Sequence, residues 1–147
     1  MIKRTILLSV SLSLSLTLLS CSKSTTVADG VEAKAEKIER ASHISMGSAG
    51  ATARQGFDIA RVFFELKAAS NVKELKLSTN EQQLIDTDGK SYTANADLSF
   101  TFGAGGGTMS MDSMFEVPKG ATLKTFKLGR ATLDLTGVNG AKPVDSR

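Results

Sequence analysis

The sequence predicts an all-β fold, a single antiparallel β-sandwich, and three observations lead to that expectation. From residue 57 onward the chain alternates apolar and polar residues with a period of two, which is typical of half-buried strands. Turn signals rich in Gly, Asp and Pro separate these runs at intervals of about eight to twelve residues. All aromatic residues, 7 Phe and 1 Tyr, lie between residues 57 and 126, so we expect the core there.

The N-terminus has the pattern of an export leader. Met1 to Arg4 carries two basic residues, and the apolar stretch from Thr5 to Leu19 is about 15 residues long, too short for a membrane-spanning helix. The remaining length suits one domain. The expected organisation is a signal peptide (1–20), a lipid attachment site, tether and lead-in (21–44), a β-sandwich (45–137) and a polar tail (138–147).

The lead-in allows two interpretations. Residues 22–30 are small and polar, which is typical of a flexible tether. In residues 31–41 the Ala, Glu and Lys content favours a helix, whereas residues 38–44 alternate with period two. We expect a partly helical or irregular lead-in and then a first strand. Residues 45–56 contain three glycines and are expected to form a loop.

The strand that begins at Phe57 is the strongest prediction. One face carries Ala60, Val62, Phe64 and Leu66, and the other carries Phe57, Ile59 and Phe63. Apolar residues on both faces predict a central strand.

The strands that follow are separated by turns. Asp86 can accept bonds from backbone amides and Gly89 can adopt positive φ, so Asp86-Thr87-Asp88-Gly89 predicts a hairpin turn between residues 83–85 and 91–93. Further alternating runs predict strands near 75–77, 98–102, 115–117, 123–128 and 133–135.

Charge and cysteine content narrow the classes of function. The formal net charge is +3, and the Lys and Arg residues are scattered singly among acidic ones. This pattern lacks the basic patch of a nucleic-acid-binding protein, so no nucleic-acid partner is expected. The chain has 1 Cys, which cannot form an internal disulfide, and an exported chain usually avoids a free thiol unless it is chemically used.

Leu18-Leu19-Ser20-Cys21 resembles the bacterial lipobox. The resemblance implies cleavage between Ser20 and Cys21 and lipid attachment to the Cys21 thiol. Each buried acyl methylene contributes about 0.8 kcal/mol, so several chains give a lasting membrane anchor. The protein would face outside the cytoplasm, and Ser22 implies the outer membrane if the host has one. The alternative is an ordinary leader followed by an incidental Cys.

Three motifs resemble the telokin-like, immunoglobulin-type domains of many bacterial lipoproteins of unknown function. They are ARVFFELKA at residues 60–68, LIDTDGKSY at 84–92 and FEVPKG at 115–120. The resemblance covers roughly residues 57–136 and departs from the family at the long lead-in and at the glycine loop 103–107. It implies an immunoglobulin-like sandwich, and it supplies no catalytic residues.

Motifs for catalysis or cofactor binding are incomplete. His43 is the single imidazole, and no strand is expected before Ser48 as a nucleophile elbow requires, so we expect no enzyme. Asp86 and Asp88 resemble the opening of a calcium loop, but its third acidic ligand and terminal Glu are missing. Residues 103–107 lack the Lys-Ser/Thr of a phosphate loop, so no cofactor is expected.

Met109, Met111 and Met114 form the most specific candidate site. Thioether sulfurs are soft ligands that suit Cu(I), and His43 and Met46 would join them if folding brings these side chains close. The favoured interpretation is that Met109 and Met111 fill space on a strand face.

The sequence therefore predicts a lipid-anchored, non-catalytic module of the cell envelope. We expect it to bind an exported partner protein or take part in assembly through its loops or a sheet edge. The alternative is an envelope lipoprotein that handles copper through its methionines.

Overall fold

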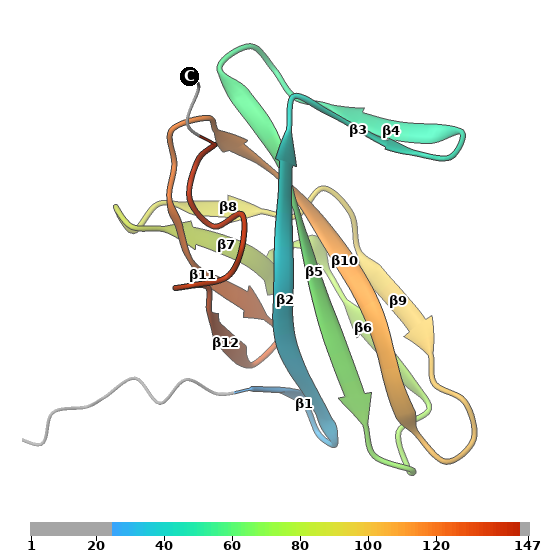
Figure 1. Cartoon of the computed structure of the whole chain (residues 1–147). Coiled ribbons are helices and arrows are strands. Elements are labelled where there is room, and N and C mark those ends of the chain that lie inside the picture. Colours follow the sequence, from blue (N-terminus) through green and yellow to red (C-terminus); the bar gives the residue numbers. More distant parts are fainter. Residues whose placement is uncertain (1–24, 145–147) are drawn as a thin grey trace, which may run out of the picture.

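The computed structural model describes residues 25–144, and its strands form two packed four-stranded sheets, the two-stranded sheet β6–β9 and the hairpin β3–β4 (Figure 1). The first sheet has the order β1-β2-β5-β10 and the second β12-β11-β7-β8, and all pairings are antiparallel. The predicted all-β sandwich is therefore confirmed. The elements are β1 (Thr26–Ala28), β2 (Val31–Ala41), β3 (His43–Met46), β4 (Ala49–Thr52), β5 (Phe57–Ala68), β6 (Glu74–Leu77), the 3-10 turn η1 (Thr79–Glu81), β7 (Gln82–Asp86), β8 (Ser91–Thr93), β9 (Leu98–Thr101), β10 (Gly107–Pro118), β11 (Leu123–Leu128) and β12 (Ala131–Asp134).

Strand β5 is the central element of the first sheet. It pairs with β10 from Phe57 opposite Pro118 to Ala68 opposite Gly107, and with β2 on its other side. Its residues Ala60, Val62, Phe64 and Leu66 are fully buried, as the alternation predicts. The face that they share is the inner face of the sandwich.

The core joins the two sheets through three buried aromatic rings. Phe126 of β11 lies 5.4 Å from Phe64 of β5 and 5.8 Å from Phe115 of β10, measured between ring centroids. Edge-to-face and tilted contacts of this kind add about 0.5–1.5 kcal/mol to the burial of each ring pair. The two-stranded sheet β6–β9 adds Leu75 and Leu77 to the same core, and Phe102, directly after β9, joins them.

The expected helical or irregular lead-in is wrong. Residues 31–41 form β2, which pairs with β5 along the sheet. A β-bulge between Ala35 and Lys37 shifts the register, so the buried residues are spaced unevenly and the period of two is hidden. Pairing and burial outweigh the helix propensity of Ala, Glu and Lys here. The first strand, β1, already lies within the expected tether.

The expected loop at residues 45–56 is also wrong, because most of it belongs to the hairpin β3–β4. The hairpin projects from the end of the first sheet where β2 ends and β5 begins (Figure 1). Its small residues and glycines show no alternation of apolar and polar side chains, so the sequence did not predict these strands. Of its side chains, Ile44 is buried.

The polar tail continues the fold instead of leaving it. The amide of Ile38 donates to the carbonyl of Asn139 at 2.8 Å, and the amide of Leu123 donates to that of Ala141 at 2.8 Å. Gly140 has φ 86°, and a Cβ there would collide with the carbonyl oxygen of Ile38. The sandwich therefore extends beyond the expected limits of 45 and 137 on both sides.

Candidate functional site

Opposite charges face one another across the strands on the outer face of the first sheet, which points away from the core. The cross-strand neighbours are Glu32 and Lys67, Lys34 and Glu65, and Glu39 and Arg61. Opposite charges in such pairs contribute about 0.2–1 kcal/mol each. The charge on this face is therefore largely balanced within the sheet.

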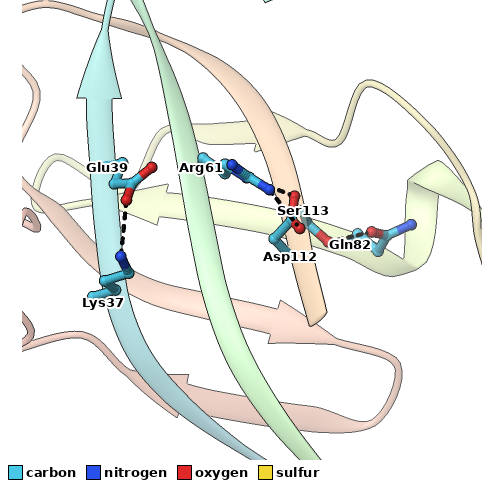
Figure 2. A network of polar contacts seen from close by, with 6 residues as sticks. All are labelled: Lys37, Glu39, Arg61, Gln82, Asp112 and Ser113. Atoms are coloured by element: carbon cyan, nitrogen blue, oxygen red, sulfur yellow. Dashed lines mark hydrogen bonds and ion pairs between the residues drawn. The ribbon is translucent and has the colours of Figure 1, made fainter. Parts of the chain in front are cut away.

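Arg61 and Phe63 connect the three long strands on this outer face. The Arg61 guanidinium donates two hydrogen bonds to the Asp112 carboxylate, at 2.9 and 3.0 Å (Figure 2), and these bonds raise the pKa of Arg61. The Phe63 ring is contacted by Arg61 at 4.5 Å and by the Lys37 ammonium at 4.4 Å. Lys37 also donates to Glu39 at 2.8 Å. Because these cations already have partners, this face resembles a solvated surface more than a ligand site.

A buried polar pair connects the two sheets (Figure 2). Ser113 on the inner face of β10 donates to the side-chain oxygen of Gln82 on β7 at 2.7 Å. The Gln82 amide nitrogen donates to the carbonyls of Ser78 at 3.1 Å and Ala96 at 3.0 Å. Both ends of this buried amide are satisfied, so the pair fixes how the sheets and two loops meet. No local sequence pattern predicts this pair.

Arg40 is a second polar group that the sequence analysis missed. Its side chain is 1% exposed and donates to the backbone carbonyls of Ala121, Pro118 and Lys119, which form the turn between β10 and β11. Burial lowers the pKa of Arg40, and the Asp58 carboxylate, 3.9 Å from Nε, opposes that effect. Arg40 therefore holds the turn in place and is a structural cation.

The Asp86 carboxylate organises the predicted hairpin turn. One oxygen accepts the backbone amides of Asp88 and Lys90, each at 2.9 Å, and the other accepts the Tyr92 hydroxyl at 2.7 Å. Gly89 adopts φ 82°. Both oxygens are occupied by protein donors, so the geometry supports the turn and offers no observation in favour of a calcium loop.

The same contact shifts two pKa values in opposite directions. The Tyr92 hydrogen bond, helped by the two amides, lowers the pKa of Asp86. Burial and the Asp86 carboxylate raise the pKa of Tyr92 to about 12. Asp86 is therefore ionised and Tyr92 protonated at neutral pH.

We expect acid to weaken the fold through Asp86. A carboxyl group whose pKa is lowered on folding contributes stability above its unfolded pKa of about 4, and loses it as the pH falls through the lower folded pKa. Tyr92→Phe should cost about 1–2 kcal/mol at pH 7 and flatten the loss below about pH 4. Urea unfolding of both proteins across this pH range measures the difference. Parallel pH profiles would contradict the assignment.

The strands separate the candidate copper ligands. Met109 and Met111 lie on the inner side of β10, opposite Leu66 and Phe64, and pack against the core. Met114 lies opposite Arg61 and therefore on the outer side. His43 and Met46 belong to another element, β3. The geometry does not bring the five side chains to one point, and it agrees with space-filling methionines.

The remaining candidate residues lie in separate parts of the chain. Ser48 lies in the turn of the hairpin β3–β4, and the His43 ring bonds to the Thr52 hydroxyl at 2.8 Å. Residues 103–106 form a turn before β10. Ser20 and Cys21 lie outside the described residues. Within residues 25–144, no three His, Cys, Asp or Glu side chains gather as metal ligands would, and no helix is long and apolar enough to cross a membrane.

A groove of about 530 Å³ lies between β2 and β12, where the two sheets meet beside the short edge strand β1. Ala33, Ala35 and Leu133 supply apolar lining, and Lys34, Glu65 and Lys67 are charged residues beside them. The edge of β2 is covered at one end by Thr25, whose carbonyl accepts the Ala33 amide. The tail covers it again at Ile38. In the part of the chain that the structure describes, no strand pairs with the β2 edge between these two points.

Comparison with known proteins adds little to this geometry. No family model matches the chain, and no curated protein sequence matches it. Among solved structures, the chain is similar to an uncharacterized β-sandwich protein from Clostridium difficile 630. The sequence identity is 12%, the similarity covers 76% of this chain and 87% of that chain, and the TM-score is 0.49. The sandwich assignment for this chain therefore depends on its own strand pairing.

Proposed function

We propose that this chain is a lipid-anchored, non-catalytic binding module of the cell envelope that takes up an extended segment of an exported protein. The observation that carries this proposal is the groove beside the uncovered edge of β2. Open strand edges recognise extended peptides through backbone hydrogen bonds, and adjacent apolar hollows hold their alternate side chains. The groove offers both features in one place.

The anchor is supported by the leader and by the short distance in sequence between Cys21 and the groove residue Thr25. Thr25 lies at the groove, and the four residue steps from Cys21 to Thr25 reach at most about 14 Å. Lipid on Cys21 would hold this end of the sandwich close to the membrane, outside the cytoplasm and at the outer membrane if the host has one. The three motifs of the telokin-like, immunoglobulin-type lipoprotein domains support the same proposal.

The experiment tests the anchor and the groove in the host cell. We expect Cys21→Ser to abolish fatty-acid labelling and to move the protein from the membrane to the soluble fraction, because the thiol is the attachment atom. In the wild-type background, a photoreactive amino acid at Thr132, which lines the groove, should crosslink to an exported protein.

Thr93 provides the matched control for crosslinking, because it is an exposed threonine of β8, which lies at the other end of the second sheet from β12 and does not line the groove. A photoreactive amino acid there should capture much less of the same protein. Membrane retention of Cys21→Ser would refute the anchor, and equal capture from Thr93 and Thr132 would refute the groove.

A further inference from the structure

The hairpin β3–β4 forms a sheet of two strands in which neither strand has another neighbour within residues 25–144. Figure 1 shows it projecting from the sandwich at the end of β2. An isolated two-stranded hairpin is marginally stable in water, and a third strand or further packing is needed to stabilise it. Here Ile44 is buried, while Ala49, Gly50 and Thr52 of β4 are exposed.

The hairpin lacks the devices that normally protect an open strand edge. Residues 42–53 contain no Asp, Glu, Lys, Arg or Pro. Proteins usually place charge, Pro or a covering segment at such edges to prevent pairing with another chain. The long strands of this fold follow that rule in part, because β1 and the tail cover β2, and the Asn95 amide donates to Met114 of β10 at 2.9 Å. Among the described residues, the hairpin has no such cover on either of its outer edges.

We propose that β4 pairs antiparallel with β4 of a second copy of this chain, about a two-fold axis at Gly50. The sequence Ala49-Gly50-Ala51 is the same in both directions, so this pairing places Ala49 opposite Ala51 of the second copy and Gly50 opposite Gly50. No charge is brought against a like charge. The small side chains allow close approach of the two backbones.

The pairing also completes the sheet. Two hairpins joined along β4 form a four-stranded sheet, which meets the requirement that two strands alone do not. Side chains alternate along the hairpin, so Ile44, Met46, Ala49 and Ala51 share one face. That apolar face continues across the two-fold axis into the second copy.

A contact between two four-residue strands is small, so we expect weak association in free solution. Copies held on one membrane surface would meet at a much higher effective concentration. The 11 residues of β2 span about 36 Å between β1 and the hairpin, which places the hairpin far from the proposed anchor. This enhancement rests on the proposed anchor, whereas the pairing itself does not.

Disulfide trapping tests the pairing and its register. Two variants of the full chain are made, one with Cys21→Ser and Ala49→Cys and the other with Cys21→Ser and Ala51→Cys. Three samples are oxidised: each variant alone and an equal mixture of the two. In the proposed register, position 49 lies opposite position 51 of the second copy, with Cβ atoms about 4.5–5.5 Å apart. Position 49 and position 49 of the second copy are diagonal neighbours, about 7–8 Å apart, and the same holds for position 51. We expect disulfide-linked dimers to form several-fold faster in the mixture. Equal rates in all three samples, or no dimer, would overturn the proposal.

A charge variant provides the second measurement. Ala49→Lys places two ammonium groups on one face of the paired strands, and we expect it to raise the dissociation constant of the dimer by about tenfold, or about 1.4 kcal/mol. Thr101→Lys adds the same charge at an exposed position of β9 and should leave association unchanged. Light scattering of the full chains in detergent measures both. A wild type that stays monomeric up to the highest concentration at which it is soluble, or equal effects of the two lysines, would overturn the proposal.

Discussion

Replacing Phe64 by alanine is expected to lower the free energy of unfolding by about 3–5 kcal/mol. Phe64 is fully buried at the centre of β5, and its ring lies 5.4 Å from that of Phe126 in the opposite sheet. The substitution removes apolar area and leaves a cavity between two sheets that cannot close without moving strands on both sides. Urea unfolding of a chain that begins at Ser22 measures this loss.

Phe63 is the matched control, because it directly precedes Phe64 in the same strand and points to the outer face. It is half-buried and contacts the Lys37 and Arg61 cations. Phe63→Ala should cost about 1–2 kcal/mol, since less area returns to water and no closed cavity remains. Equal losses for Phe63 and Phe64 would mean that the two faces of β5 have been assigned wrongly.

Arg40→Met is expected to cost about 3 kcal/mol, the second largest effect of a single substitution proposed for this chain. Methionine keeps most of the side-chain volume but removes every donor to the carbonyls of Pro118, Lys119 and Ala121. It also leaves Asp58, whose side chain is 17% exposed, without its cation. Unmet carbonyls and an unpaired carboxylate near the core are both costly.

Arg54→Met is the matched control for Arg40→Met, because it removes the same charge from an exposed position. Arg54 also pairs with a carboxylate, that of Glu116, but its side chain is 73% exposed. Exposed ion pairs contribute about 0–1 kcal/mol, so this variant should lose much less stability than Arg40→Met. Thermal and urea unfolding of the two variants check the order, and a reversed order would contradict the structural role of Arg40.

The strands after Phe57 were predictable because their side chains alternate without interruption between two environments. In β5, β11 and the 86–89 turn, the local sequence contains the determining signal: a period of two, or an Asp and a Gly at the positions that a hairpin turn needs. In β2 the bulge between Ala35 and Lys37 breaks that period, and the strand exists because β5 lies beside it. Such a partner cannot be read from residues 31–41 alone.

The buried polar residues were missed for a related reason. Gln82, Arg40 and Ser113 occupy inner positions of their strands, where an alternation pattern expects apolar residues. Each is tolerated because a group far away in the sequence satisfies it, as Ser113 does for Gln82. The Asp86 turn depends on neighbours within a few residues and was predicted, which shows that local polar contacts are readable and long-range ones are not.

The tail that bonds to Ile38 and Leu123 has a consequence for when the chain can fold. The edge of β2 receives its cover from residues near the end of the sequence, and β1 meets the start of β12 where the Arg130 amide donates to the Val27 carbonyl. Contacts between such distant residues form late and slowly, because a long loop must close before they contribute. The first strands therefore cannot complete the burial of their inner faces until the C-terminal residues are available to pack against them. If the chain is exported as we propose, this order of events would keep it unfolded while it crosses the membrane.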